Sequence, residues 1–360
     1  MLRFRSRLDR SLLCRAAILV VSVLVAPAIV RGDDVALVPG STVKMAIGGH
    51  VRGSVQSESP SGVVVTLGTN TTTVPIDLIV SIRYDGQSPS FQLGESREAA
   101  DQLAEAADLF KKAATESAGR PFPVQAALFR EAQVLAELAT VEPDRLKEAR
   151  SKLDHFIRTY PGGRHIAPAR EALARLQIHT GDFAGAETTI AALARMPKAG
   201  EKAAVLRTRV LARQGKHDQA IAALDQLIGS SPKGSARQRA AMLAKAESLA
   251  ATRKYKEAEE LVRQVITASP PEDAASQAPA YNTLGDCLRA ANRPKDALIA
   301  YLHTDLLYSK DKEEHPRALH SISLVFRQLK QDARADEFAQ RLRQEYPRSA
   351  WNRVSASPTQ

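Results

Sequence analysis

The pattern of hydrophobic and polar positions changes once along the chain, from a period of two to a helical period. Within residues 35–86, hydrophobic residues stand at every second position of short runs, as at Val63 and Val65. Turn sequences such as Gly68-Thr69-Asn70 separate these runs. After this segment, hydrophobic residues recur with the period of an amphipathic helix. The pattern therefore predicts a small β module followed by helices to the end of the chain.

The β module is expected to contain four or five short strands that form a small, strongly bent antiparallel β-barrel. A glycine inside a strand, such as Gly53, is typical of a sheet that curls sharply. The Gly-x-Val-x-Gly-x-Val sequence at 49–55 and the closing strand at 76–84 resemble Sm-like and related small barrels. That resemblance implies either a packing or docking module or a surface that binds RNA, peptides or cell-wall glycan. Because Tyr84 is the single aromatic residue of the segment, the docking role is favoured.

Residues 87–123 are expected to hold a linker and one amphipathic helix. The helix is predicted over 96–117, where Ala99, Leu103 and Phe110 fall on one face. Glycine and prolines in 118–123 end it. The segment is a possible degenerate copy of the repeat that follows.

An internal repeat organises residues 124–350, which we predict to be a solenoid. Each copy has an alanine, hydrophobic residues four and seven positions later, and a proline five positions beyond. The four full copies are Ala149-Leu153-Phe156-Pro161, Ala220-Leu224-Leu227-Pro232, Ala258-Val262-Val265-Pro270 and Ala335-Ala339-Leu342-Pro347. The two looser copies begin at Ala186 and Ala297, so that successive alanines are 37, 34, 38, 39 and 38 residues apart. A second amphipathic helix precedes most copies, which predicts about six helix hairpins.

The repeat resembles the tetratricopeptide repeat (TPR) family. The best upstream match is Tyr281-x-x-Leu284-Gly285-x-x-Leu288, followed by the alanine, hydrophobic and proline positions of the second helix. Small residues allow two helices to cross closely, and proline ends the second helix. The resemblance implies a mainly α fold, a right-handed superhelical TPR solenoid preceded by the small antiparallel β-barrel. The ten residues 351–360 are taken as a C-terminal tail.

The first 32 residues have the features of a secretory signal peptide. They hold six arginines against Asp9 alone, and a hydrophobic run follows at 16–30. Cleavage after Ala28 or Gly32 would fit; an uncleaved membrane anchor is disfavoured because the run is shorter than about 20 residues and contains Pro27. We therefore expect export to a bacterial periplasm or cell envelope. After cleavage Cys287 is the single cysteine, which excludes an intramolecular disulfide.

Composition adds little to this picture and excludes wholesale disorder, since 44% of residues are hydrophobic and 25% are charged. The formal net charge of +10 falls to +5 without the first 32 residues. That modest charge, with no aromatic platform, disfavours nucleic acid as a partner.

No pattern of catalytic chemistry is found. The chain lacks phosphate-binding glycine loops, zinc-protease and nucleophile-elbow motifs, and its eight histidines are scattered. His315, before Pro316, is expected at a turn, and Cys287 in a packed first helix. We therefore expect no enzyme activity, cofactor or metal, and no transmembrane helix after signal cleavage.

The candidate site comes from the TPR resemblance, which implies that first helices line a concave groove. The register places there Glu171, Arg175, Arg209, Arg213, Glu247, Asn282, Asp286, Arg289, His320 and Arg327. Because arginine is the commonest of these, an extended peptide with acidic or C-terminal carboxylate groups is the expected ligand. The set does not match the lysine–asparagine carboxylate clamp of chaperone-binding relatives.

The predicted function is a non-enzymatic protein–protein interaction scaffold in the periplasm or cell envelope, with an envelope complex as one expected assembly. Two repeats end in Tyr160-Pro161 and Tyr346-Pro347-Arg348-Ser349. These ends look like those of bacterial envelope TPR proteins that coordinate outer-membrane assembly or cell-wall constriction. The alternative is an RNA-binding or cell-wall-binding accessory protein that acts through the β-barrel.

Overall fold

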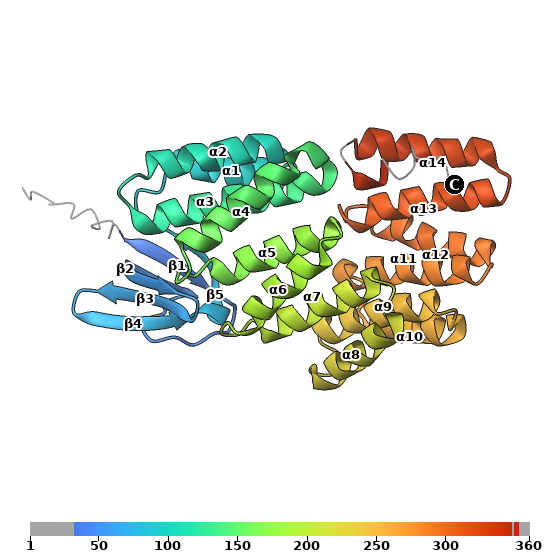
Figure 1. The fold of residues 1–360 in the computed structure, drawn as a ribbon, viewed down its shortest axis with the longest axis horizontal. Helices are drawn as coiled ribbons and strands as arrows, with labels where there is room; N and C mark the ends of the chain where they lie inside the picture. The colour runs from blue at the N-terminus through green and yellow to red at the C-terminus, as the bar shows by residue number, and fades with distance from the viewer. Residues whose placement is uncertain (1–31, 348, 353–360) are drawn as a thin grey trace, which may run out of the picture.

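The computed structural model describes residues 32–347 and 349–352, and it shows a β module followed by helices to the C-terminal end (Figure 1). The predicted signal peptide at 1–32 lies outside these residues except for Gly32, and so do residues 353–360 of the predicted tail. The strands are β1 (Asp33–Leu37), β2 (His50–Ser59), β3 (Gly62–Leu67), β4 (Asn70–Pro75) and β5 (Ile79–Arg83).

The five strands form one antiparallel sheet in the order β4-β3-β2-β1-β5. The first half of β2 pairs with β1, and the second half, from Ser54 on, pairs with β3. Gly53 lies at this change of partner with φ 154°, and a Cβ there would overlap the carbonyl oxygen of Thr66. The glycine therefore allows the sharp bend that the sequence predicts.

The sheet differs from the predicted barrel in one respect: within the described ranges, β4 and β5 each pair with a single neighbour, so backbone pairing does not close it. Helices cover its inner face instead. Tyr84, which follows β5, and Phe91 of α1 (Pro89–Ala99) are buried in the same hydrophobic cluster as Val35 and Val65 of the strands. A small sheet can bury its hydrophobic face against helices as well as by closing on itself.

The β module is also held to the helices by a buried ion pair. Nε of Arg164, in the loop after α4 (Leu146–Thr159), lies 3.2 Å from Oε1 of Glu58 in β2, and the hydroxyl of Tyr84 donates to the same oxygen. The Glu58 side chain is 1% exposed, and burial raises the pKa of its carboxyl even though Arg164 lowers it. The module is therefore fixed to the start of the solenoid.

Six helix hairpins follow within the described residues, as predicted, and one further hairpin precedes them. The remaining helices are α2 (Leu103–Glu116), α3 (Pro121–Val141), α5 (Ile166–His179), α6 (Phe183–Ala194), α7 (Gly200–Arg213), α8 (His217–Ser230), α9 (Ala236–Ala251), α10 (Tyr255–Ala268), α11 (Ala274–Ala290), α12 (Pro294–Leu307), α13 (Glu314–Gln328) and α14 (Asp332–Glu345). Short 3-10 turns lie at Ile76–Leu78 and Pro143–Arg145. The odd-numbered helices from α3 on are the first helices of the repeats.

The helix predicted over 96–117 is in fact the hairpin of α1 and α2. The chain turns at Asp101, which has φ 60°, and Ala99 is exposed at the end of α1. The ring of Phe91 packs edge-on against Phe110 of α2, with centroids 5.2 Å apart. The expectation of one continuous helix was wrong because this aromatic contact folds α1 back onto α2.

The second helices bury the predicted positions of the repeat. In α4, α8, α10 and α14 the alanine of each copy is fully buried, and so is the alanine of the looser copies in α6 and α12. In the hairpin of α11 and α12, Gly285 faces the ring of Tyr301 so closely that an added Cβ would overlap it. Small residues at these crossings therefore set the distance between neighbouring helices, as the sequence predicts.

The two ends of the solenoid approach each other. Nζ of Lys312, in the loop before α13, donates to the backbone oxygen of Ala99 at 3.1 Å, although the two residues are 213 positions apart. Figure 1 shows α13 and α14 returning toward the height of α1 to α4. None of the helices in the described ranges is both long and apolar enough to span a bilayer.

Candidate functional site

Charged side chains of neighbouring first helices lie close enough to act on one another, and we call the surface that they form the groove. Burial lowers the pKa of Arg209 on α7, and the neighbouring charge of Arg175 on α5 lowers it further; Glu247 on α9 and Glu313 before α13 act in the opposite direction. Burial also acts on Glu247: its side chain is 52% exposed, yet desolvation by the surrounding protein raises the pKa of its carboxyl.

The part of the groove formed by α5 and α7 is predominantly cationic. Glu171 accepts from Arg175 at 2.7 Å and from Lys202 at 3.0 Å. These two cations hold the pKa of the Glu171 carboxyl below its usual value, although burial opposes them. Arg209 and Arg213 form no ion pair with any other residue in the described ranges. Four cations are thus set against one carboxylate.

The part formed by α9, α11 and α13 is predominantly anionic and is organised around Arg317. The Arg317 guanidinium lies 2.6 Å from Asp286, 3.3 Å from Glu314 and 3.4 Å from Glu247. Although burial acts against it, the three carboxylates raise the pKa of Arg317. One cation therefore holds three anions together, and the group keeps a negative charge.

Buried polar side chains fix these carboxylates in place. The amide of Asn282 donates to the backbone oxygen of Glu314 at 2.9 Å and to its Oε2 at 2.7 Å. The hydroxyl of Tyr301 donates to Oδ1 of Asp286 at 2.5 Å. The anionic part of the groove is thus preorganised by neighbours that do not themselves face solvent.

All ten predicted groove residues lie on first helices. Glu171, Arg175, Arg209, Arg213, Glu247, Asp286 and Arg289 belong to α5, α7, α9 and α11. Two of the other three are buried and do not face solvent. Asn282 is 0% exposed, His320 is buried with its ring 5.2 Å from that of Trp351, and Arg327 pairs with Asp336 of α14 at 3.3 Å.

The sequence reasoning missed Lys202, Glu314, Arg317 and Trp351. A signal for two of them is present: Lys202 and Arg317 each stand 18 residues before the alanine of their second helix, Ala220 and Ala335. Each reaches back to a carboxylate of the preceding first helix. Comparing that position across the repeats would have identified both cations.

A second polar cluster lies at the C-terminal hairpin and is structural. His315, which the sequence placed at a turn, is buried in the first turn of α13. Its Nε2 donates to Oδ1 of Asp305 at 2.8 Å, its Nδ1 lies 2.8 Å from the hydroxyl of Tyr346, and Arg341 of α14 also binds Asp305. The cluster joins α12, α13 and α14.

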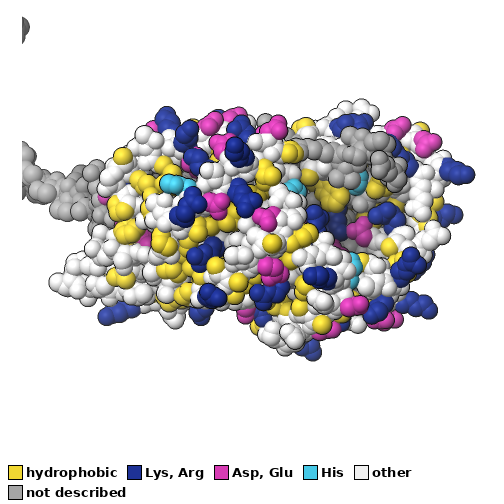
Figure 2. All heavy atoms as spheres, in the orientation of Figure 1, with side chains coloured by type: hydrophobic (Ala, Val, Ile, Leu, Met, Phe, Trp, Pro, Cys, Tyr) yellow, Lys and Arg dark blue, Asp and Glu magenta, His cyan; other side chains and the backbone are white. Residues whose placement is uncertain are grey.

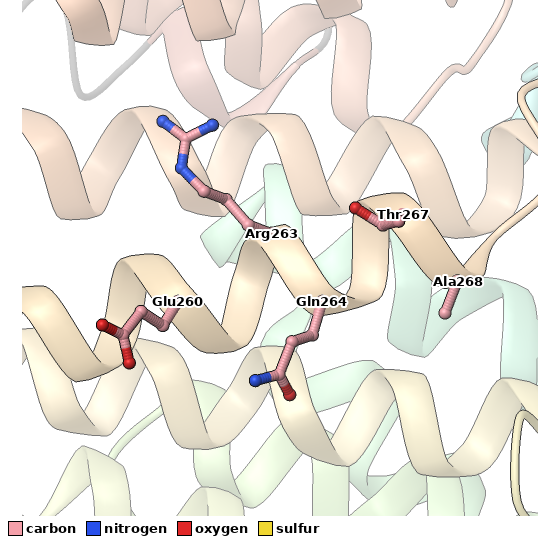
Figure 3. A pocket seen from close by; sticks show the side chains of 5 residues that line it. All are labelled: Glu260, Arg263, Gln264, Thr267 and Ala268. Atoms are coloured by element: carbon pink, nitrogen blue, oxygen red, sulfur yellow. The ribbon is translucent and has the colours of Figure 1, made fainter.

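Cys287, the potential metal ligands and a surface hollow give no further candidate site among the described residues. Burial raises the pKa of the Cys287 thiol to about 12, which leaves it protonated at neutral pH. Groups of three or more potential metal ligands do not occur within 32–347 and 349–352. The hollow in Figure 3 is lined by Glu260, Arg263, Gln264, Thr267 and Ala268, all from α10, and their side chains point apart.

One face of the molecule shows how these charges are distributed. Figure 2 shows basic and acidic side chains interspersed over the helical part of this face, whereas hydrophobic side chains gather over the N-terminal part. The candidate groove residues come from the first helices of several repeats.

Stacked helix hairpins with small residues at their crossings define an α-helical repeat solenoid. The tetratricopeptide repeat family matches residues 171–235, 205–273 and 243–304, and a second tetratricopeptide repeat family matches residues 317–349. These segments are tetratricopeptide repeats, and the solenoid is a TPR solenoid.

One solved structure supports the fold. The chain is similar to a tetratricopeptide repeat protein from Parabacteroides merdae, with a TM-score of 0.51, 14% identity, and coverage of 71% of this chain and 91% of that one. It also resembles the type IV pilus biogenesis factor PilW, with a TM-score of 0.41, 14% identity, and coverage of 63% and 98%. The quorum sensor NprR from B. thuringiensis is similar with a TM-score of 0.48 and 14% identity, and the match covers 70% of this chain and 74% of that one. No curated protein matches the chain by sequence.

Proposed function

We propose that this protein is a non-enzymatic scaffold that binds an extended segment of a partner protein along the groove. The observation that carries the proposal is the pair Arg209 and Arg213, two cations that face the groove without an ion-pair partner among the described residues. A cation left unpaired at a partly desolvated surface gains from a carboxylate supplied by a ligand. Continuous concave surfaces of this kind are what helical solenoids use for binding.

We further propose that the scaffold acts in a bacterial periplasm or cell envelope. The support is the arginine-rich leader with its hydrophobic run, which has the features of a secretory signal. The β module supports a structural role at the N-terminal end, because it shares a hydrophobic core and the Glu58–Arg164 ion pair with the solenoid. In this role it stiffens the first repeats and leaves the groove open.

Site-specific photocrosslinking in the native host tests the groove. A photoreactive residue at position 213 is expected to give a covalent adduct with a partner protein, and the adduct should disappear when Arg209→Glu is added. The matched control is position 207 of the same helix, whose arginine pairs with Glu187 at 3.4 Å outside the groove. Equal adducts at positions 207 and 213 would contradict a groove ligand.

The mass and the cell fraction of the native protein test the compartment. A mature chain that begins near Asp33 in the periplasmic fraction is the expected result. A full-length chain in the cytoplasmic fraction would contradict export.

A further inference from the structure

We propose that the groove selects a partner segment in which acidic and basic residues stand in separate blocks, the acidic block against α5 and α7 and the basic block against α9, α11 and α13. This inference rests on the proposed function and specifies the partner's chemistry. It follows from the division of the groove into two parts of opposite charge.

The cationic part demands anions from its ligand. Arg175, Lys202, Arg209 and Arg213 outnumber Glu171 on these two helices, and the charges of Glu247 and Glu313 offset only part of the excess at Arg209. Arg209 and Arg175 repel each other. A run of carboxylates along these two helices relieves that repulsion, because each one adds an opposite charge at a surface that is poorly solvated.

The anionic part demands cations for the same reason. Arg317 is shared by Glu247, Asp286 and Glu314, and Arg289 of α11 is a second cation of this part, so one negative charge remains. Glu247 is the most exposed of the three, and its other neighbours include Asp286 and Glu314. A lysine or arginine of the ligand that reaches Glu247 completes a network that the protein itself leaves short of cations.

Geometry sets the length of the blocks. Neighbouring packed helices are about 8–10 Å apart, and an extended chain advances about 3.3 Å per residue. A bound segment therefore passes roughly three residues per first helix, about six over the cationic part and about nine over the anionic part.

The same division disfavours nucleic acid. A phosphate backbone carries one sign of charge along its whole length, so the part that contacts Glu247, Asp286 and Glu314 would be repelled. A uniformly acidic peptide suffers the same repulsion. Only a ligand with both signs of charge, separated along its length, satisfies both parts of the groove.

Fluorescence anisotropy with synthetic probes tests the inference on the full chain. The central comparison is between two labelled peptides of the same composition, one with six glutamates followed by six lysines and one with the residues alternating. A polyglutamate peptide and a single-stranded RNA of similar length complete the set. We expect the block peptide to bind at least about tenfold more tightly than the other three, because only it places each charge opposite its complement.

Charge-reversed variants tie the binding to the groove. Arg209→Glu combined with Arg213→Glu is expected to lower the affinity for the block peptide at least about tenfold. Glu247→Lys is expected to weaken binding of the same peptide, because it reverses a charge in the anionic part of the groove. Arg207→Glu, on the same helix as the first pair but paired with Glu187, is the control and should leave binding unchanged. Circular dichroism and the emission of Trp351, the single tryptophan of the chain, verify that each variant is folded.

Three results overturn the inference: equal affinity for block and alternating peptides, tighter binding of RNA or polyglutamate, or an equal effect of Arg207→Glu. Its failure can be separated from failure of the proposed function. A crosslinked partner at position 213 whose bound segment lacks the two blocks refutes the charge selection alone. Absence of any adduct specific to position 213 refutes groove binding itself, and the charge selection with it.

Discussion

Gly285 shows at the scale of one residue how this solenoid fixes its helix spacing. The residue lies in α11, where a side chain would overlap the ring of Tyr301 in α12. Tyr301 is fully buried, and its hydroxyl donates to Asp286 in the groove, so the ring is restrained from both ends. One glycine therefore connects the packing of two helices to the placement of a groove carboxylate.

Gly285→Ala is expected to lower the free energy of unfolding. An overpacked helix crossing costs roughly 1–3 kcal/mol, which exceeds the gain of about 1 kcal/mol from better helix propensity. Thermal denaturation followed by circular dichroism measures the change.

The matched control is Gly229→Ala in α8, where nothing lies within 4 Å of the added Cβ. That substitution should stabilise the protein by about 0.5–1 kcal/mol. If both variants behave alike, the crossing at Tyr301 does not depend on glycine.

The buried positions of the second helices could be predicted from the sequence, whereas the partners of the groove residues could not. The spacing of Ala220, Leu224 and Leu227 places all three on one helix face, and all three are buried. The contact of Arg317 with Asp286 instead depends on how one repeat is rotated against the next. That rotation is not expressed in the period of a single repeat, which is why Asn282 and His320 were wrongly expected to face the groove.

At the scale of the element, the C-terminal hairpin is held by a buried ionic cluster rather than by packing alone. Asp305 of α12 accepts from His315 of α13 at 2.8 Å and from Arg341 of α14 at 2.9 Å. Burial opposes ionisation of this carboxyl, but the hydrogen bonds from both partners and the charge of Arg341 hold its pKa below the ordinary value. Three helices therefore share one carboxylate.

Asp305→Asn is expected to destabilise α14 at pH 7 by about 3 kcal/mol, the low end for a buried pair because Arg341 is 34% exposed. A carboxyl with a depressed pKa stabilises the fold above its unfolded value, near 3.8, and this contribution is lost as the pH falls through the folded pKa. The difference between wild type and variant should therefore shrink below about pH 4.

Urea denaturation followed by the emission of Trp351, whose ring lies near His320 of α13, provides the measurement at both pH values. Asp296→Asn on the same helix is the control, because Asp296 pairs with Arg293 at the exposed start of α12. A constant difference between pH 7 and pH 3 would refute the role of the Asp305 charge.

The elements themselves followed from the sequence except where a tertiary contact overrode the local pattern. Residues 96–117 have a continuous helical period, yet the chain turns at Asp101. The edge-on contact of Phe91 with Phe110 holds α1 folded back on α2. Residue spacing alone does not distinguish one continuous helix from two helices that fold back on each other. The bent sheet was predictable from Gly53, but the burial of its inner face under helices depends on the whole fold.

At the scale of the whole molecule, the β module and the solenoid meet at Glu58 and Arg164. The Glu58 carboxyl is almost entirely buried, and its Oε2 has no hydrogen-bond partner. Arg164 is the cation that compensates it. The attachment of the module therefore depends on a charge pair in which one member is hidden from water.

Arg164→Ala is expected to loosen the β module, because breaking a buried pair leaves an uncompensated charge and costs roughly 3–5 kcal/mol. Burial already raises the pKa of Glu58, and loss of Arg164 raises it further. The penalty is thus present at neutral pH and is relieved as the pH falls through that raised pKa.

Hydrogen exchange followed by mass spectrometry should show faster exchange in β1 to β5 at pH 7 and partial recovery in Arg164→Ala combined with Glu58→Gln. The control is Arg120→Ala, since Arg120 donates to the backbone oxygen of Gly86 at 2.6 Å but pairs with no buried carboxylate. Unchanged exchange in the strands of Arg164→Ala would show that hydrophobic contacts alone hold the module.

The contact between Lys312 and Ala99 has a mechanical consequence for the superhelix. A single exposed hydrogen bond contributes about 1 kcal/mol, so thermal motion breaks it in roughly one molecule of six. Breaking it leaves every hairpin packed on its neighbours, and those nearest-neighbour contacts supply the stability of a solenoid. The superhelix is therefore elastic: the distance between its two ends can increase and decrease at ambient temperature while the repeats themselves stay folded.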